Sequence, residues 1–360
     1  MGRSIYSHDG KRLLLVKGTV LDNIYVQRLL SMGYQSVYAL DDLTEDIEPQ
    51  ELISPIVRTQ ANSTVFEFHE KVELLNNLRK FEQLRQIAND IIYEVLGLDL
   101  KETTIDFPEI KSFDNYLYLH SVNVAVLGTI ICYKLRLHEE VMLDYALGAM
   151  LHDIGKVETP AEILHKPGPL SEDEFDVIKK HSRDGFALLS QSSFMKPRSF
   201  SIALQHHEAY DGSGYPAGKK GEEIHQFSRI ASVVDIFDAL TTDRPYKKRW
   251  SFHKTLNLMK NRISKRLDPE VMEVLLSLVP EFPAGLVVKL STGESGIIIS
   301  ANPNMRLDPK VRIIEDAKGN KLNKEWVYEI NLGEFKEIRI VSTSEDSAEE
   351  IAKRRKEAEN

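Results

Sequence analysis

The chain has 360 residues, which is long for one hydrophobic core, so two or three domains are expected. Its 42% hydrophobic and 28% charged residues are typical of a globular protein. The net charge of −9 argues against a broad surface for duplex nucleic acid, because phosphate backbones attract basic surfaces. A small phosphorylated ligand held by a few local cations remains compatible with this charge.

The single cysteine, Cys132, excludes an intrachain disulfide framework and a cysteine-rich zinc site. The apolar run around it, VNVAVLGTIICYKL, is interrupted by Asn123 and Lys134, so it is too short to span a bilayer. The first residues, MGRSIYSHDGKR, contain no apolar core of a signal peptide. We therefore expect no membrane span and a cytoplasmic location.

Residues 1–60 are predicted to form a small N-terminal α/β domain. Asp9-Gly10 separates two short apolar stretches, a pattern typical of a β-hairpin. The segment DNIYVQRLLSMGY has helical spacing of its apolar residues, with Gly33 as the expected C-cap. The following QSVYAL predicts a returning strand.

Residues 61–105 are predicted to form a charged linker helix. From Ser63 to Leu100 the apolar residues recur at three- and four-residue spacing, as on one face of a helix. The heptads are imperfect, so the sequence leaves open both a plain linker and a coiled coil that would make a homodimer.

The largest unit, residues 106–282, has helical patterns and few strand signals, and we expect it to be the catalytic domain. After the segment PEFP the pattern changes to strand, glycine-containing turn and strand, which predicts a small β-rich domain at 283–343. Residues 344–360 form a charged tail. The predicted fold class is therefore mainly α, with an all-helical core flanked by two small domains.

Histidines and aspartates in the helical unit carry the strongest chemical signal. Imidazole and carboxylate groups without thiolates suit borderline to hard divalent ions. Burying several such groups unpaired is costly, and a metal would offset that cost. Asp153 stands out because it follows His152 directly at the end of the apolar segment ALGAML. The candidate ligands are His120, His152, Asp153, His181, His206, His207 and Asp235.

The order of these motifs resembles the HD-GYP domain, a branch of the HD phosphohydrolase superfamily. HDIGK comes first, then His181, then HHEAYDGSGYP at 206–216, then an aspartate followed by DRPYKKR. The resemblance covers roughly residues 110–275. It implies an all-helical core, two or three metal ions, commonly iron or manganese, and hydrolysis of the bacterial second messenger cyclic di-GMP to pGpG or GMP.

The resemblance also implies roles for individual residues. The seven candidate ligands would bind the metals, with Asp153 as the bridging carboxylate. Lys156 would face the scissile phosphate, and Arg244 and Lys247 would hold the substrate phosphates. A water bridging two cations has a lowered pKa, so it would attack as hydroxide.

Several positions need a separate interpretation. Family members with three metals have a glutamate four residues before the first histidine; Tyr116 stands there in this chain, so we predict two metals. Glu208 and Asp211 are expected to order the loop or to support ligands. For Tyr215 we favour packing or partner contact over stacking on a guanine. The resemblance also suggests diguanylate cyclases as partners of the GYP loop.

Two other functions stay open at this point. The chain could be an HD hydrolase for another cyclic dinucleotide or a nucleotide phosphate, although Arg244, Lys247 and the complete GYP loop favour cyclic di-GMP. It could instead be a cyclic di-GMP receptor with little turnover, for which Tyr116 is the main argument. We expect none of the remaining histidines in or near the helical unit to be a ligand: His69, His138, His165, His225 and His253.

Overall fold

The computed structural model describes most of the chain. The described residues are 2, 4–7, 12–32, 34, 37, 42–44, 46–47, 52–98, 116–242, 249–302, 305–344 and 346, with the backbone alone described for 6, 116, 117, 301, 302 and 305–308. Several predictions fall outside this part of the chain: the strand at 35–40, the cap Gly33, the side chain of Tyr116, Arg244, Lys247 and most of the tail.

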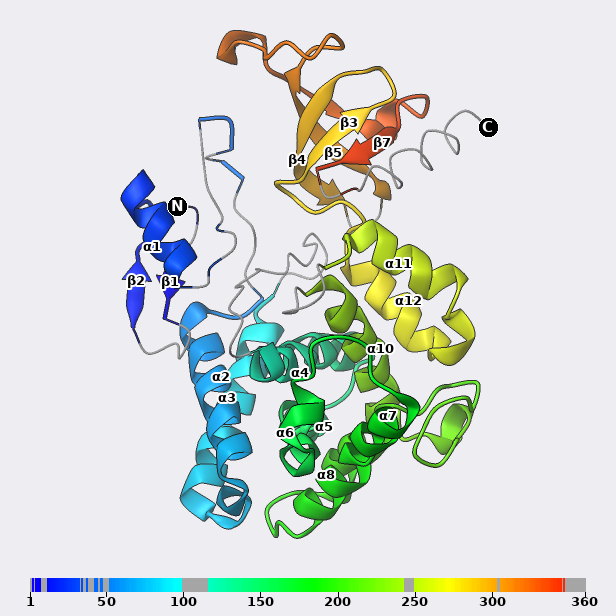
Figure 1. Ribbon diagram of the computed structural model, residues 1–360. Helices are drawn as coiled ribbons and strands as arrows, with labels where there is room; N and C mark the ends of the chain where they lie inside the picture. Colours follow the sequence, from blue (N-terminus) through cyan, green and yellow to red (C-terminus); the bar gives the residue numbers. More distant parts are fainter. Residues whose placement is uncertain are drawn as a thin grey trace.

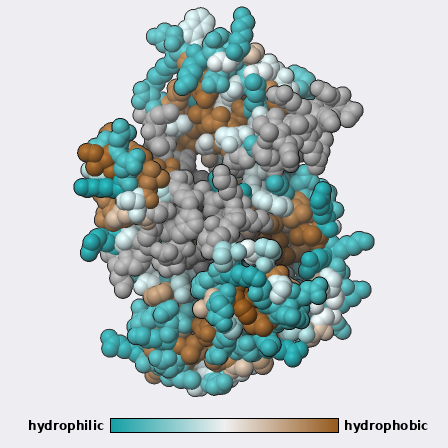
Figure 2. Space-filling view, viewed as in Figure 1, coloured by the Kyte–Doolittle hydropathy of each residue, from teal (hydrophilic) through white to brown (hydrophobic). Residues whose placement is uncertain are grey.

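The N-terminal unit contains the expected hairpin and helix. Strand β1 (Ile5–Tyr6) pairs antiparallel with β2 (Leu13–Leu15). Helix α1 (Asn23–Ser31) begins after Asp22, whose side chain accepts hydrogen bonds from the first free backbone N–H groups. Figure 2 shows apolar residues on the surface of this small unit, and α1 leaves Ile24 63% exposed.

The predicted linker helix takes a different form. Helix α2 (Pro55–Glu70) ends near Lys71, a 3-10 turn (Val72–Asn76) follows, and α3 (Leu78–Leu96) returns alongside α2 (Figure 1). Asn77 caps the new helix by accepting from the Lys80 backbone N–H. The apolar face of α3 packs into the same hydrophobic core as the following helices. That face is therefore unavailable for the intermolecular coiled coil that the sequence left open.

The helical core is built around α4 (Tyr116–Lys134), which contacts α2, α3, α5, α10 and α12. Its middle is buried on every side, which explains why its apolar residues show little periodicity. The other helices of this unit are α5 (Glu139–Met150), a 3-10 helix (Ile154–Glu158), α6 (Ala161–Leu164), α7 (Glu172–Lys179), α8 (His181–Ser190), α9 (Pro197–Gln205), α10 (Gln226–Thr241), α11 (Phe252–Asn261) and α12 (Pro269–Leu278).

The predicted β-rich unit is a five-stranded antiparallel sheet with the strand order β6-β5-β4-β3-β7. Its strands are β3 (Val287–Leu290), β4 (Ser295–Asn302), β5 (Met305–Glu315), β6 (Tyr328–Asn331) and β7 (Ile340–Thr343). The sheet has its own small core, separate from that of the helices. Figure 1 shows the sheet apart from the main group of helices. The fold class is therefore mainly α, as predicted. Within the described part of the chain, the helices that are long enough to cross a bilayer are not apolar enough to do so.

Candidate metal centre

The candidate ligands come from five helices and mostly from helix ends. His120 lies near the start of α4, and His152 and Asp153 follow α5 directly. His181 is the first residue of α8, His206 and His207 follow α9, and Asp235 lies within α10. A side chain at a helix end can point along the axis into the space between helices, so several helices can supply one centre.

Close backbone packing brings the HDIGK segment against α8. A Cβ atom on Gly155 would lie 2.1 Å from the His181 carbonyl oxygen and 2.4 Å from the Gly185 nitrogen. A side chain at this position would push the two segments apart. Glycine is thus required here for His152 and Asp153 to approach His181.

Asp153 lies at the middle of the cluster. Its Oδ1 is 3.5 Å from Nε2 of His181 and 3.8 Å from Nε2 of His206, and its Oδ2 is 3.5 Å from Nε2 of His152. On one side His120 Nε2 lies 2.9 Å from an oxygen of Asp235. A carboxylate surrounded in this way can be shared between two cations.

Two groups of three side chains have the spacing of metal ligands. One group is His181, His206 and His207, and the other is His120, His152 and Asp153. In each group the ligand atoms lie within 4.8 Å of one another. Asp235 connects the groups, because its second oxygen lies 3.9 Å from Nδ1 of His207. The structure thus brings all seven predicted ligands together.

Two buried atoms in this cluster have no hydrogen-bond partner among the described residues. They are Nε2 of His152 and Oδ1 of Asp153, both acceptors that point into the cluster. Leaving a buried polar atom unsatisfied costs about 1 to 3 kcal/mol. A bound divalent cation would satisfy both atoms, so the donor set fits a metal.

The main chain orients three of the histidines. Nδ1 lies 2.7 Å from the Ala149 carbonyl oxygen in His152 and 2.6 Å from the Ile178 carbonyl oxygen in His181. In His206 it lies 2.8 Å from the Ile202 carbonyl oxygen. A carbonyl oxygen only accepts, so Nδ1 carries the proton and the Nε2 lone pair faces the cluster. This is the usual arrangement of a metal-binding histidine.

The charge state of these groups agrees with metal binding. Burial lowers the pKa of His152, His181 and His206, so these imidazoles are neutral near pH 7. Burial alone would raise the pKa of Asp153, but the Lys156 ammonium holds it well below its usual value. Neutral imidazoles around an ionised carboxylate are the forms that bind cations.

His120 differs from the other histidines. Burial acts to lower its pKa, but hydrogen bonds to Asp235 and Asp238 outweigh this and raise the pKa to about 9. Nδ1 of His120 donates to Asp238 Oδ2 at 2.6 Å. Sequence reasoning missed Asp238, although it lies one helical turn after Asp235, where a carboxylate on the same face could have been expected.

Lys156 lies beside the cluster, on the 3-10 helix that follows Asp153. Its Nζ is 2.5 Å from Asp153 Oδ2, and its side chain is 20% exposed. The ammonium keeps donors beyond the one used by Asp153, and its contact with a scissile phosphate stays a prediction.

The loop 206–216 is ordered by its own carboxylates. Glu208 is 2% exposed and accepts from the backbone N–H groups of Ala217 and Lys219 at 2.8 and 3.0 Å. Asp211 accepts from the backbone and the hydroxyl of Ser213. Both residues thus order the loop, which agrees with our expectation.

Gly214 and Tyr215 complete this loop. A Cβ on Gly214 would lie 2.2 Å from the Ala209 nitrogen and 2.4 Å from the His207 carbonyl oxygen, so only glycine fits. The Tyr215 ring packs on His207 with a centroid distance of 4.7 Å, and the Tyr215-Pro216 peptide bond is cis. The packing agrees with the role that we favoured for Tyr215.

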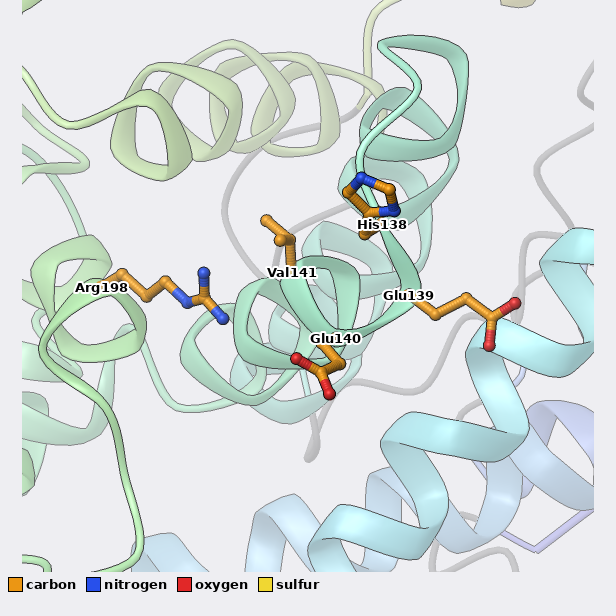
Figure 3. Close-up of a pocket in the computed structure, with 5 residues that line it drawn as sticks. All are labelled: His138, Glu139, Glu140, Val141 and Arg198. Atoms are coloured by element: carbon orange, nitrogen blue, oxygen red, sulfur yellow. The ribbon is translucent and has the colours of Figure 1, made fainter.

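The remaining histidines lie outside the two ligand groups. His69 is 9% exposed, because the face of α2 that carries it packs on α4. His225 accepts from the Phe227 backbone N–H, and His253 pairs with Glu281. His138 is exposed and, with Glu139, Glu140, Val141 and Arg198, lines a surface pocket that contains none of the candidate ligands (Figure 3).

Comparison with known proteins places this centre in a family. Residues 108–271 match the model of the HD domain, and residues 287–353 match that of a KOW domain associated with the HD domain. The cyclic di-GMP phosphodiesterase PA4108 of Pseudomonas aeruginosa is 32% identical over 233 residues, which are 64% of this chain and 56% of that protein. The 3′3′-cGAMP-specific phosphodiesterase 1 of Vibrio cholerae is 41% identical over 162 residues, which are 45% of this chain and 37% of that protein.

A solved structure supports the fold. The HDG"Y"P protein Bd1817 of Bdellovibrio bacteriovorus superposes with a TM-score of 0.50 over 76% of this chain and 92% of its own, at 16% identity. This structural likeness extends beyond residues 108–271. The aligned part of this chain covers about half the length or less of the two curated relatives. With the HDIGK, HHE and GYP motifs gathered at one centre, the chain belongs to the HD-GYP branch of the HD-domain family.

Proposed function

We propose that this protein is a phosphodiesterase that hydrolyses cyclic di-GMP to pGpG, GMP or both, with two divalent metal ions, iron or manganese. The observation that supports this most directly is the buried cluster around Asp153, in which Asp153 Oδ1 and His152 Nε2 are acceptors without a partner among the described residues. The similarity to a cyclic di-GMP phosphodiesterase supports the substrate.

The proposed ligands divide between two ions that share Asp153. His120, His152 and Asp235 would hold one ion, and His181, His206 and His207 the other. When bound, the two ions would supply an acidified water near neutral pH and would neutralise charge on the phosphodiester. Main-chain carbonyl oxygens fix the rings of His152, His181 and His206, so their Nε2 atoms face the centre before an ion arrives.

The protein's own side chains would position the substrate. Lys156 is held by Asp153 and can donate its remaining N–H groups to a phosphate oxygen. Arg244 and Lys247 lie outside the described residues, and their contact with the substrate phosphates stays a prediction from the motif. These cations would give an acidic protein a local attraction for an anionic substrate.

A related cyclic dinucleotide is the second candidate substrate. The relative from Vibrio cholerae acts, by its name, on 3′3′-cGAMP, and it is 41% identical over the aligned region. Cyclic di-GMP and 3′3′-cGAMP share the phosphodiester ring and differ in one base, so the metal centre alone does not discriminate between them. Direct competition between the two substrates would decide the preference.

Partners and location are further proposals. Tyr215 is partly exposed beside His207, which leaves the GYP loop accessible to a protein such as a diguanylate cyclase. A homodimer would need a surface other than the buried face of α3. A cytoplasmic location is what hydrolysis of an intracellular messenger requires.

The test is product analysis with protein purified without oxygen and loaded with Mn(II) or Fe(II). Cyclic di-GMP and 3′3′-cGAMP would each be incubated with the intact protein and with Asp153→Ala. We expect linear products from the intact protein only, because the variant loses the shared carboxylate. Metal content is measured in parallel, so that loss of metal and loss of chemistry are distinguished.

The two possible failures have different meanings. Bound metal and bound nucleotide without product from the intact protein would contradict the enzyme and favour a cyclic di-GMP receptor. Full metal content and normal turnover in Asp153→Ala would contradict the assignment of the centre itself.

A further inference from the structure

A partly buried hydrogen-bond path joins helix α2 to His120. Nη1 of Arg58 donates to Oδ1 of Asn123 at 2.9 Å, and Nδ2 of Asn123 donates to Oδ1 of Asp238 at 2.8 Å. The other oxygen of Asp238 accepts from Nδ1 of His120 at 2.6 Å. Because a guanidinium only donates and a carboxylate only accepts, the amide orientation of Asn123 is fixed by its two neighbours.

The path links a buried cation, Arg58, to a buried carboxylate, Asp238, beside His120. Arg58 is 8% exposed, Asp238 is 3% exposed and His120 is 4% exposed. A buried guanidinium is costly unless its charge is balanced and its donors are used. The amide of Asn123 links the two groups, because it accepts from one guanidinium N–H and donates to the carboxylate.

The path starts outside the matched HD domain. Arg58 lies in the first turn of α2, whereas the domain match begins at residue 108. Helix α2 packs against α4, which carries His120, and against the 3-10 helix that carries Lys156. The segment upstream of the domain therefore contributes polar contacts as well as apolar packing next to the centre.

We propose that Arg58 is a positioning residue for the metal centre, acting on His120 through Asn123 and Asp238. This inference rests on the proposed metal centre but not on its substrate. Arg58 holds the Asn123 amide, the amide holds Asp238, and Asp238 fixes the His120 ring with Nε2 toward Asp235 and the ion. A displacement of α2 would break the path at Arg58, so the N-terminal segment can weaken metal binding without touching a ligand.

The experiment measures Mn(II) affinity of the full chain by competition with a chelator. The proteins are the wild type, Arg58→Met, Asn123→Ala and the double variant. Loss of outer support for a ligand typically weakens metal binding about 10- to 100-fold, and we expect about 10-fold for Arg58→Met because it acts through two further residues. The double variant should bind no more weakly than Asn123→Ala alone, because both changes break one path.

Two further variants separate positioning from general stability. Arg198→Met removes an ion pair of the helical core, the one between Arg198 of α9 and the buried Asp144 of α5 (Figure 3 shows Arg198). We expect it to lower the thermal midpoint of the metal-free protein while Mn(II) affinity stays at the wild-type value. Arg58→Lys keeps the charge and a donor, so it should recover part of the affinity lost in Arg58→Met.

Three results would overturn the proposal: wild-type Mn(II) affinity in Arg58→Met, fully additive losses in the double variant, or an equal loss in Arg198→Met. If Arg58→Met does not fold, the same cycle is run with Arg58→Gln, which also removes the charge, and additive losses or an unchanged affinity in that variant are equally decisive. Absence of cyclic dinucleotide hydrolysis by the wild type would contradict the proposed function but leaves this binding test unaffected.

Discussion

His120 and the histidines at the ends of α8 and α9 face the same centre but are oriented by different parts of the protein. His181 and His206 donate to main-chain carbonyl oxygens three and four residues earlier in the chain. His120 donates to Asp238, a side chain 118 residues away. The first arrangement follows wherever the helix ends form, whereas the second requires α4, α10 and α2 to pack correctly.

The orientation of these histidine rings therefore depends on the sequence in two different ways. No side-chain replacement removes a carbonyl oxygen, so the orientation of His181 and His206 is vulnerable only through the ligands themselves or the backbone path. The orientation of His120 can be lost through residues that never contact an ion. Four substitutions test the contrast, ordered from the largest expected effect to the smallest.

Replacing a ligand whose ring is oriented by a main-chain carbonyl oxygen should have the largest effect. His206→Ala removes a ligand atom, so we expect loss of metal well beyond the roughly 100-fold that outer-shell changes cost, with loss of turnover. Elemental analysis gives the metal-to-protein ratio. His138→Ala, an exposed histidine outside the centre, is the matched control. Retention of two ions per chain by His206→Ala would contradict the ligand assignment.

Replacing the support of His120 should have an intermediate effect. Asp238→Asn keeps the shape of the side chain, but one of its two acceptor oxygens becomes an NH2 group and the other loses its negative charge. The hydrogen bond to His120 Nδ1 is therefore lost or weakened, and the His120 ring loses its fixed orientation. We expect metal affinity to fall about 10- to 100-fold, measured by chelator competition. An affinity equal to the wild type would show that α4 packing alone orients His120, and the contrast between the two regions would disappear.

Disturbing the backbone of the loop 206–216 should lower the stability of the protein. Gly214→Ala would place a methyl group within 2.4 Å of the His207 carbonyl oxygen. Forcing such a group into a packed site costs typically about 1 to 3 kcal/mol, and the loop that carries His207 must shift. Thermal unfolding measures the loss. Gly97→Ala, where the added atom meets nothing closer than 3.4 Å, is the control and should stay near the wild type.

The smallest effect is expected for a cluster of charged side chains away from the metal centre. Glu281 pairs with Lys260 and His253 at 2.7 and 2.9 Å, next to the start of the β-sheet unit. Burial acts to raise its pKa, but the hydrogen bonds from His253 and Lys260 lower it to about 2. Glu281→Gln should therefore lower the free energy of unfolding at pH 7 by about 0.5 to 1.5 kcal/mol.

The pH dependence of this loss has a definite sign. Because the folded-state pKa of Glu281 lies below its ordinary value, the stabilisation is complete above about pH 4.5 and is lost as the pH falls toward 2. The difference between wild type and Glu281→Gln, measured by urea unfolding, should shrink between about pH 5 and 3. A difference that is constant over this range would show that the carboxylate contributes packing and no charge.

How far the sequence predicted this molecule differs between the two regions. The motif order HDIGK, HHE and GYP indicated the family, the seven candidate ligands and the glycine-dependent turn. The division of the predicted linker helix into α2 and α3 was missed, because the apolar spacing continues across the break at Lys71. Asp238 was missed because its role depends on a contact with α4, and Arg58 because nothing in its local sequence distinguishes a buried arginine from a solvated one.

The sequence by itself determined the mainly helical core, the β-rich C-terminal unit and the chemistry of the centre. These follow from residue order, because helix ends, turns and motif spacings are set by contacts a few residues apart. Only the tertiary structure decided that α2 and α3 join the core and that Arg58 and Asn123 reach Asp238. Those contacts join residues 65 and 115 positions apart. No local pattern encodes them, because they exist only after several helices have packed.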